Sequence, residues 1–308
     1  MKTVSLAKLF LTSLLLITVG LFLASPAFAQ DDDMTTSGTA NTANSGDNDR
    51  KIADFTQAIQ NDPRNAQNYF QRAFVYMQTG EDDKAISDLT QAIQMDPKFD
   101  KAYFRRSFVY MTKGSYDLAT ADLNQAVQIN PQFTKAYYRR ACVNMMVGND
   151  DQAVADLTKT IQINPNFFQA YLRRSYAYML KGDYARAITE LNEFIQNHPK
   201  GAAAYNRLAW LLATCPQASF RDGKKAVEDA TNACNIAGWK MSAQLDTLAA
   251  AYAEAGDFIN AVKWENEAIA NQSDAKIAED QKSRLTLYEK YQPYHVDKYV
   301  PTFTAVVN

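Results

Sequence analysis

Five prolines divide most of the chain into segments of equal length. They are Pro63, Pro97, Pro131, Pro165 and Pro199, and each lies 34 residues after the one before it. A strict period in this range is typical of stacked supersecondary units rather than of a single closed core. We therefore expect a repeat protein, in which each unit packs mainly against its neighbours.

Between the prolines, the same residue types return at the same places. Relative to the proline that closes each unit, a Tyr lies 28 residues before it, a Gly 17, an Ala 12 and a Leu 8. The series are Tyr69, Tyr103, Tyr137 and Tyr171; Gly80, Gly114, Gly148 and Gly182; Ala85, Ala119, Ala153 and Ala187; and Leu89, Leu123, Leu157 and Leu191. Consecutive units should therefore share one structure.

One unit can be interpreted as two antiparallel helices. Tyr103, Ser107 and Tyr110 share one stripe of a first helix, because they follow the i, i+4, i+7 spacing of a helix face. Gly114 suits the left-handed conformation that ends many helices. A second helix follows and ends before Pro131, since proline cannot continue a helix and also restricts the residue before it.

This pattern of aromatic, small, Tyr, Gly, Ala, Leu, Ala and Pro residues resembles the tetratricopeptide repeat. The resemblance extends over about residues 51–274 and implies an all-α fold, a right-handed superhelical solenoid of antiparallel helix pairs. It also implies that the first helices line a concave groove. The chain departs from the family at Arg72, Arg106, Arg140 and Arg174, which stand where the family commonly has Leu.

The pattern divides the chain into a leader, a linker, a row of repeats and a C-terminal end. We expect a signal peptide at residues 1–29, a disordered acidic linker at 30–49 and a half repeat at 50–65. Full repeats follow at 66–99, 100–133, 134–167 and 168–201, and irregular repeats at 202–241 and 242–274. A polar capping helix at 275–291 should shield the end of the stack. Residues 292–308 form a tail whose packing the pattern does not predict.

The first residues have the pattern of an export signal. Lys2 and Lys8 precede an apolar run at residues 9–23, and a small-x-small pattern ends at Ala29. We predict cleavage after Ala29 and a periplasmic or secreted mature protein, with no stable membrane insertion after cleavage. The alternative is an inner-membrane protein anchored by an uncleaved leader, although the apolar run is shorter than the ~20 residues that a span needs.

Composition and motifs argue against catalysis and nucleic-acid binding. A net charge of −2 lacks the strong basic field that nucleic-acid binding needs. His198 and His295 have no Cys, Ser or carboxylate at motif spacing, and no metal, nucleophile or nucleotide signature is present in the sequence. We therefore predict a protein that is not an enzyme, with no catalytic, metal or cofactor site. Cys142, Cys215 and Cys234 should be free and mostly buried, because helix geometry separates the last two too widely for a disulfide.

The functional prediction concerns the other face of the first helices. Aromatic side chains alternate there with Lys and Arg, which suits an extended or helical peptide with apolar anchors and carboxylates. The predicted peptide-binding residues are Phe74, Lys101, Phe104, Arg105, Phe108, Lys135, Tyr138, Arg139, Arg173 and Tyr176. The chain would then be a non-catalytic protein–protein interaction scaffold, whose partner is a protein or peptide with apolar and acidic residues.

Two other interpretations stay open. In the first, these aromatic residues pack against the adjacent first helix and the basic residues are solvated. In the second, the chain is a self-associating or helper subunit of an envelope enzyme or of a secretion or polysaccharide assembly. The sequence is compatible with a homo-oligomer.

A second set of arginines should face the partner helix of each unit. An acidic residue recurs on that helix with the same period as the arginines. The arginines are Arg72, Arg106, Arg140 and Arg174, and the acidic residues are Asp54, Asp88, Asp122, Asp156 and Glu190. We expect this ladder of arginine–carboxylate pairs to set the register of the repeats.

Overall fold

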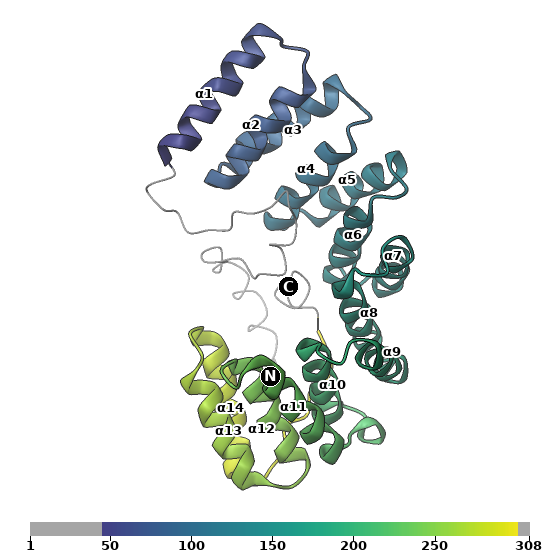
Figure 1. Ribbon diagram of the computed structural model, residues 1–308, viewed down its shortest axis with the longest axis vertical. Helices are drawn as coiled ribbons and strands as arrows, with labels where there is room; N and C mark the ends of the chain where they lie inside the picture. Colours follow the sequence, from purple (N-terminus) through teal and green to yellow (C-terminus); the bar gives the residue numbers. More distant parts are fainter. Residues whose placement is uncertain (1–44, 301–308) are drawn as a thin grey trace, which may run out of the picture. The chain divides into compact units, whose positions relative to one another are not determined.

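The described part of the chain consists of helices and short connections. The structure, a computed structural model, describes residues 45–300 (Figure 1). Its helices are α1 (Ser45–Asn61), α2 (Ala66–Thr79), α3 (Asp82–Met95), α4 (Asp100–Thr112), α5 (Tyr116–Ile129), α6 (Thr134–Met146), α7 (Asp150–Ile163), α8 (Phe168–Leu180), α9 (Tyr184–Asn197), α10 (Ala202–Thr214), the 3-10 helix η2 (Ala218–Phe220), α11 (Gly223–Ala237), α12 (Ser242–Glu254), α13 (Phe258–Ala270) and α14 (Ala275–Glu289). Residues 45–300 contain no strand, and the predicted all-α class is confirmed.

The described residues belong to two compact units, residues 45–88 and 89–300. The first unit contains α1, α2 and the start of α3, and the second contains the end of α3 and the helices α4 to α14. In the second unit α4 packs on α5, α6 on α7, α8 on α9, α10 on α11 and α12 on α13. Successive pairs also touch, since α5 packs on α6, α7 on α8 and α11 on α12. These contacts give the stacked helix pairs of a solenoid.

The helix ends follow from the local sequence. After α4, Gly114 adopts a φ of 72°, and the Ser115 N–H donates to the Tyr110 carbonyl at 2.8 Å. The left-handed conformation there favours glycine. After α5, Asn130 is extended, with φ −127° and ψ 90°, because the proline that follows disfavours helical geometry. Both predicted helix ends are confirmed.

Helix α1 begins earlier than its sequence predicts. α1 starts at Ser45, whereas residues 30–49 were assigned to a disordered linker and the half repeat to residues 50–65. Asp47 lies in the first turn, where the helix dipole favours negative charge. Lys51 Nζ lies 2.5 Å from Asp47 Oδ2, one turn along the helix. These local interactions extend the helix into polar sequence, and residues 30–44 lie outside the described range.

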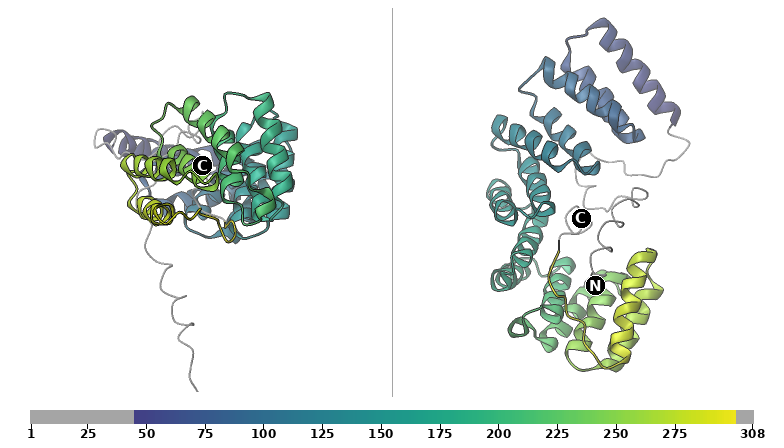
Figure 2. Two further views of the ribbon diagram at one scale, coloured as in Figure 1. Left: turned by 90° about the horizontal axis from the view of Figure 1, so that it is seen from below. Right: turned by 180° about the vertical axis from the view of Figure 1, so that it is seen from behind.

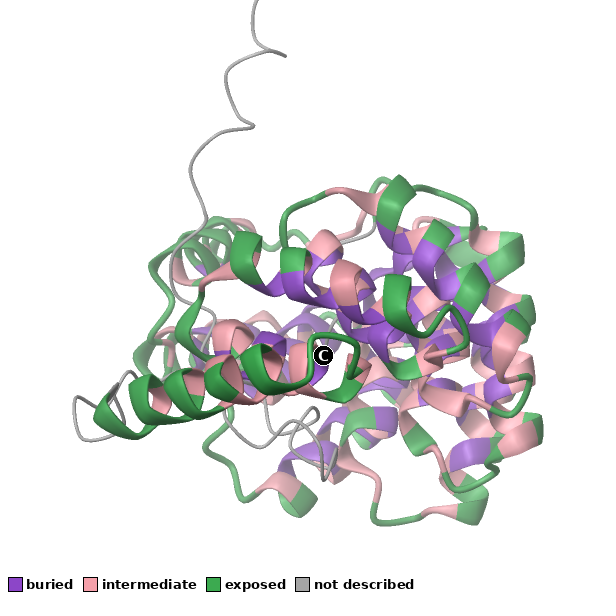
Figure 3. Cartoon of the chain, turned by 90° about the horizontal axis from the view of Figure 1, so that it is seen from above, coloured by how far each residue is buried: buried purple, intermediate pink, exposed green. Residues whose placement is uncertain are grey.

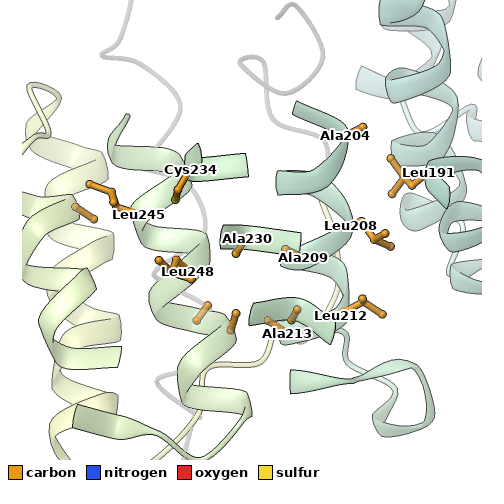
Figure 4. Packing of buried hydrophobic residues seen from close by; sticks show 14 of the residues in the cluster. Leu191, Ala204, Leu208, Ala209, Leu212, Ala213, Ala230, Cys234, Leu245 and Leu248 are labelled. Atoms are coloured by element: carbon orange, nitrogen blue, oxygen red, sulfur yellow. The ribbon is translucent and has the colours of Figure 1, made fainter. Parts of the chain in front are cut away.

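Small and apolar side chains fill the space between the helices. In Figure 3 the buried positions lie on the sides of helices that face other helices, and the exposed positions lie on the outward sides. Figure 4 shows one layer of the core, in which Leu191 of α9, Leu208 of α10, Ala230 of α11 and Leu248 of α12 belong to one cluster. Alanines there let neighbouring backbones approach, and leucines fill the remaining volume.

The cysteines carry thiols rather than disulfides. Cys142, Cys215 and Cys234 are free and buried, as predicted. Burial raises the pKa of all three thiols, and that of Cys234 to about 11. A thiol with a raised pKa is mostly protonated and unreactive near neutral pH. These cysteines therefore act as small apolar residues of the core.

The predicted ion-pair ladder is present. Its pairs are Arg72–Asp88, Arg106–Asp122, Arg140–Asp156 and Arg174–Glu190. In the second of these, Arg106 Nε and Nη2 donate to the two carboxylate oxygens of Asp122 at 2.8 and 2.7 Å. Arg106 Nη1 donates to the Thr90 hydroxyl at 2.9 Å. Because Thr90 lies on α3, one guanidinium joins α4 to its own partner helix and to the second helix of the preceding repeat.

We predict that Arg106→Met lowers the free energy of unfolding by about 3 kcal/mol, because it leaves the buried Asp122 carboxylate without its cation. Urea denaturation followed by circular dichroism measures the loss. The double variant Arg106→Met, Asp122→Leu should recover most of it, since no charge then stays buried. Unchanged stability in the single variant would contradict the role of the ladder in setting register.

A second charged cluster joins α14 to the helices before it. Arg284 Nε and Nη2 lie 2.9 and 2.8 Å from Asp246 Oδ1, and Arg284 Nε lies 3.5 Å from Glu265 Oε1. Glu265 is fully buried. Burial, and then the charge of Asp246, raise the pKa of Glu265 to about 10. The cluster anchors α14 on α12 and α13, so this helix covers the end of the stack.

We predict that the melting temperature falls as the pH rises from about 5 to about 9, and that Glu265→Gln removes most of this fall. The folded chain keeps a proton on Glu265 up to a pH of about 10, whereas the unfolded chain releases it near the ordinary value of 4.5. The stabilisation is therefore complete below the unfolded pKa and is lost as the pH rises toward the folded one. Thermal unfolding at both pH values measures the change.

The control for this prediction is Asp246→Asn, which deprives Arg284 of its nearest carboxylate. It should lower the melting temperature at both pH values, because it leaves a buried cation poorly paired. If the melting temperature of Glu265→Gln showed the same pH dependence as that of the unsubstituted chain, the prediction that Glu265 is protonated in the folded state would be wrong.

Candidate functional site

The predicted binding residues lie on first helices in both units. Phe74 lies on α2 of the first unit and is partly buried. The others lie in the second unit and are Lys101, Phe104, Arg105 and Phe108 on α4, Lys135, Tyr138 and Arg139 on α6, and Arg173 and Tyr176 on α8. The side of α4, α6 and α8 that bears Lys101, Phe108, Lys135, Tyr138 and Tyr176 is called the first-helix face below.

The predicted residues differ in their access to solvent. Lys101 is exposed, and the other residues of the first-helix face are partly buried. Arg105, Arg139 and Arg173 keep only 4%, 5% and 2% of their surface exposed. Burial, and then the charge of Arg139, lower the pKa of Lys135. The predicted arginines therefore lie beneath the first-helix face, and the lysines lie nearer to solvent.

A partly buried arginine continues the series into a fourth repeat. Arg207 on α10 lies 34 residues after Arg173 and completes a series that we call the arginine row. The row consists of Arg105, Arg139, Arg173 and Arg207. Arg207 was not among the predicted binding residues, although its 34-residue spacing from Arg173 places it in the same series.

Two members of the row connect consecutive first helices. Arg139 Nη1 donates to the Phe104 carbonyl at 3.1 Å, and the guanidinium carbon lies 3.8 Å from the centre of the Phe104 ring. Arg207 Nη1 donates to the Leu172 carbonyl at 2.5 Å, and its guanidinium lies 5.3 Å from the Tyr176 ring. Each therefore joins its own helix to the first helix of the preceding repeat, through a main-chain carbonyl and an aromatic ring.

Arg173 has fewer partners than these two. Its Nε donates to the Tyr138 hydroxyl at 3.0 Å, while Nη1 and Nη2 are buried without a hydrogen-bond partner. No carboxylate within residues 45–300 forms a salt bridge with Arg139, Arg173 or Arg207. A buried guanidinium without an anion costs free energy, because it has lost its hydration and gained no opposite charge.

The pKa values of two arginines in the row are lowered by burial and by repulsion from a neighbouring arginine. Burial, and then repulsion from Arg105, lower the pKa of Arg139 to about 9. Burial, and then repulsion from Arg173, lower the pKa of Arg207 to about 10. Both shifts show that these guanidinium groups are poorly hydrated and are repelled by a neighbouring arginine of the row. A negatively charged group would be stabilised there by charge-assisted hydrogen bonds.

A segment near the C-terminus reaches the same helices. Residues 292–300, called the C-terminal segment below, follow α14 and run beside α10 (Figure 2). The Val296 N–H donates to the Thr214 carbonyl at 3.0 Å, and the Tyr176 hydroxyl donates to the Val300 carbonyl at 2.9 Å. The packing of this tail could not be predicted from the sequence, because its contacts join residues far apart in the chain.

The described residues offer neither a metal site nor a membrane-spanning helix. Residues 45–300 hold no cluster of three or more His, Cys, Asp or Glu side chains placed to bind a metal ion. In the same part of the chain, no helix combines the length and the apolar character that a membrane span requires. The predicted leader lies outside this range.

Comparison with known proteins identifies the repeats. Three family models, each described as tetratricopeptide repeat, match residues 46–113, 100–133 and 169–201. No curated protein matches the chain. The predicted resemblance to this family is confirmed by the matched repeats.

Solved structures of repeat proteins are also similar to the chain. MamA is 26% identical, with a TM-score of 0.48 over 52% of this chain and 94% of that chain. PilW, a type IV pilus biogenesis factor, is 17% identical, with a TM-score of 0.57 over 70% of this chain and 97% of that chain. A tetratricopeptide repeat protein from Parabacteroides merdae is 16% identical, with a TM-score of 0.54 over 80% of this chain and 94% of that chain. The three family-model matches show that the chain contains tetratricopeptide repeats, and its described helices stack in pairs as such repeats do.

Proposed function

We propose that the chain binds an extended, acidic segment of a partner protein on the first-helix face. As a tetratricopeptide repeat protein, the chain is a protein-interaction scaffold, and its family is generally non-catalytic. The proposal adds the place of binding and the chemistry of the partner. Phe108, Tyr138 and Tyr176 supply partly buried aromatic area for apolar anchors, and Lys101 supplies an exposed positive charge.

The contrast between two adjacent arginines carries the proposal. Arg174 receives the carboxylate of Glu190, with Nη2 2.7 Å from Oε1. Arg173, one residue earlier, has two buried nitrogens without a partner. The scaffold thus supplies an anion to one arginine and none to the other. An Asp or Glu side chain of a partner would supply the negative charge that Arg173 lacks.

Access to Arg173 requires a local rearrangement. Its one hydrogen-bond partner is the hydroxyl of Tyr138, which belongs to the first-helix face. Rotation of the Tyr138 ring would uncover the guanidinium, and changes of side-chain rotamer at an interface are common on binding. Tyr138 would then contribute both to the apolar surface and to the opening of the charged site.

We further infer that the mature protein is exported, on the basis of the leader pattern alone. The mature chain should begin at Gln30, because the small-x-small pattern ends at Ala29. Mass spectrometry of the N-terminal peptide from the envelope fraction measures the cleavage site. A chain that keeps Met1 and stays with the membrane would instead support the anchored form.

We predict that a photo-crosslinker at Phe108, on the first-helix face, captures a protein partner in the native envelope. The matched control places the crosslinker at Leu118 of α5, an exposed residue of a second helix. Crosslinked species should form from Phe108 and not from Leu118, and mass spectrometry identifies the partner segment. Capture from Leu118 alone would contradict the proposed site.

We predict that Arg173→Met lowers the affinity for the partner captured in this way by at least tenfold. The same substitution should raise the melting temperature by about 2 °C or more. Binding falls because the carboxylate loses its cation, and stability rises because an unpaired charge leaves the interior. The matched control is Arg174→Met, which should lower the melting temperature because Glu190 loses its partner. If Arg173→Met were destabilising and left affinity unchanged, the arginine would have a structural role instead.

A further inference from the structure

The C-terminal segment lies on α8 and α10 in the manner of an extended ligand. Its middle is held by the hydrogen bond from the Val296 N–H to the Thr214 carbonyl, and its last residue by that from the Tyr176 hydroxyl to the Val300 carbonyl. Within the described residues, the first of these is the one backbone–backbone hydrogen bond from the segment to α8 or α10. The segment is therefore attached to these helices mainly through side chains.

Tyr299 is the main anchor of the segment. Its side chain is 6% exposed and packs in a core cluster that includes Met179, Tyr184 and Cys215. The Tyr184 ring packs edge-on against the Tyr299 ring, with 5.9 Å between ring centres. The Tyr299 hydroxyl lies 3.3 Å from Thr214 Oγ1. Burial raises the pKa of the phenol. A buried aromatic ring with a satisfied hydroxyl is typical of the residues that dominate binding energy at interfaces.

The residues around Tyr299 make weaker attachments. Asp297, Lys298 and Val300 are exposed. His295 Nε2 lies 2.6 Å from Glu254 Oε2, and Glu254 also accepts from Arg221 Nε at 3.0 Å. The segment thus has an anchor at His295, an apolar contact at Val296 and a buried ring at Tyr299, with solvated side chains between them. This is the spacing of a bound peptide rather than of a core element.

We propose that the surface formed by Tyr176, Tyr184 and Thr214 is a docking surface for an extended partner segment with an aromatic anchor, and that the C-terminal segment is its resident competitor. The partner segment would carry a Tyr three residues after a β-branched residue, as Val296 and Tyr299 do. This inference rests on the proposed function and deepens it. Tyr176 connects the two, since it belongs to the first-helix face and also binds Val300.

Competition follows from the covalent connection of the segment. A tethered ligand acts at an effective concentration in the millimolar range for short linkers, so it occupies the surface unless a partner binds more tightly. The apparent affinity of a partner is reduced by the fraction of chains whose surface is free. Weakening the C-terminal segment should therefore raise the affinity for any competing peptide.

The test uses the full chain and a fluorescent synthetic peptide with the sequence of residues 292–300. In Tyr299→Ala the resident segment loses its anchor, and the peptide should bind this variant at least tenfold more tightly than the unsubstituted chain. Fluorescence anisotropy measures both affinities. Val296→Pro is a second variant, because it removes the N–H that donates to Thr214 and keeps the Tyr299 ring. Circular dichroism shows whether both variants stay folded.

Two controls test whether the peptide binds through its Tyr299 ring and at the proposed surface. A peptide that carries the Tyr299→Ala change should fail to bind, since it lacks the ring that fills the site. Leu118→Ala on α5 should leave peptide affinity at the value of the unsubstituted chain. Equal binding of the peptide to the unsubstituted chain and to both folded variants, or no binding to any, would overturn the proposal. The assay needs no envelope partner and no Arg173, so its failure is distinguishable from failure of the crosslinking and Arg173→Met experiments.

Discussion

A bidentate arginine–carboxylate pair inside each regular repeat is the contact on which the arrangement of the helices depends. The guanidinium is planar and its donors point in fixed directions. It can therefore donate to both oxygens of a carboxylate only in one relative placement of the two helices. Arg106 adds a third helix by donating to Thr90 of the preceding repeat. Repeated at every unit, this contact gives consecutive pairs the same register.

The same register creates the arginine row. Arg105, Arg139 and Arg173 each directly precede a ladder arginine, so the same register brings them to equivalent places beneath the first-helix face. Arg207 precedes Leu208 instead, but it keeps the 34-residue spacing. Arg139 stacks on the Phe104 ring of the preceding repeat, and Arg207 binds the main chain of the preceding repeat. Four cations thus follow one another through the second unit. The ladder supplies carboxylates to its own arginines, whereas Arg139 and Arg207 contact carbonyls and rings, and Arg173 contacts one hydroxyl.

Much of this could be predicted from residue types and spacing. The period of the prolines, the glycines after the first helices and the acidic residues opposite Arg106 and Arg140 are local or strictly periodic signals, and each is present in the structure as expected. The burial of Arg139 and Arg173 was not predicted, because helical spacing indicates the side on which a residue lies but not how closely the next helix approaches. The early start of α1 was missed for a related reason, since polar composition concealed a local ion pair.

The sequence by itself determined the repeating helix pairs and their internal ion pairs, because both depend on contacts between residues at most about one repeat apart. Only the tertiary structure decided what covers the end of the regular repeats. Tyr176 and Val300 are 124 residues apart, and Thr214 and Tyr299 are 85 apart. These residues do not follow the 34-residue period, so no pattern in the sequence predicts their contact. The C-terminal segment lies there because stacking brings Tyr184, Cys215 and the Thr214 carbonyl to the place that Val296 and Tyr299 reach.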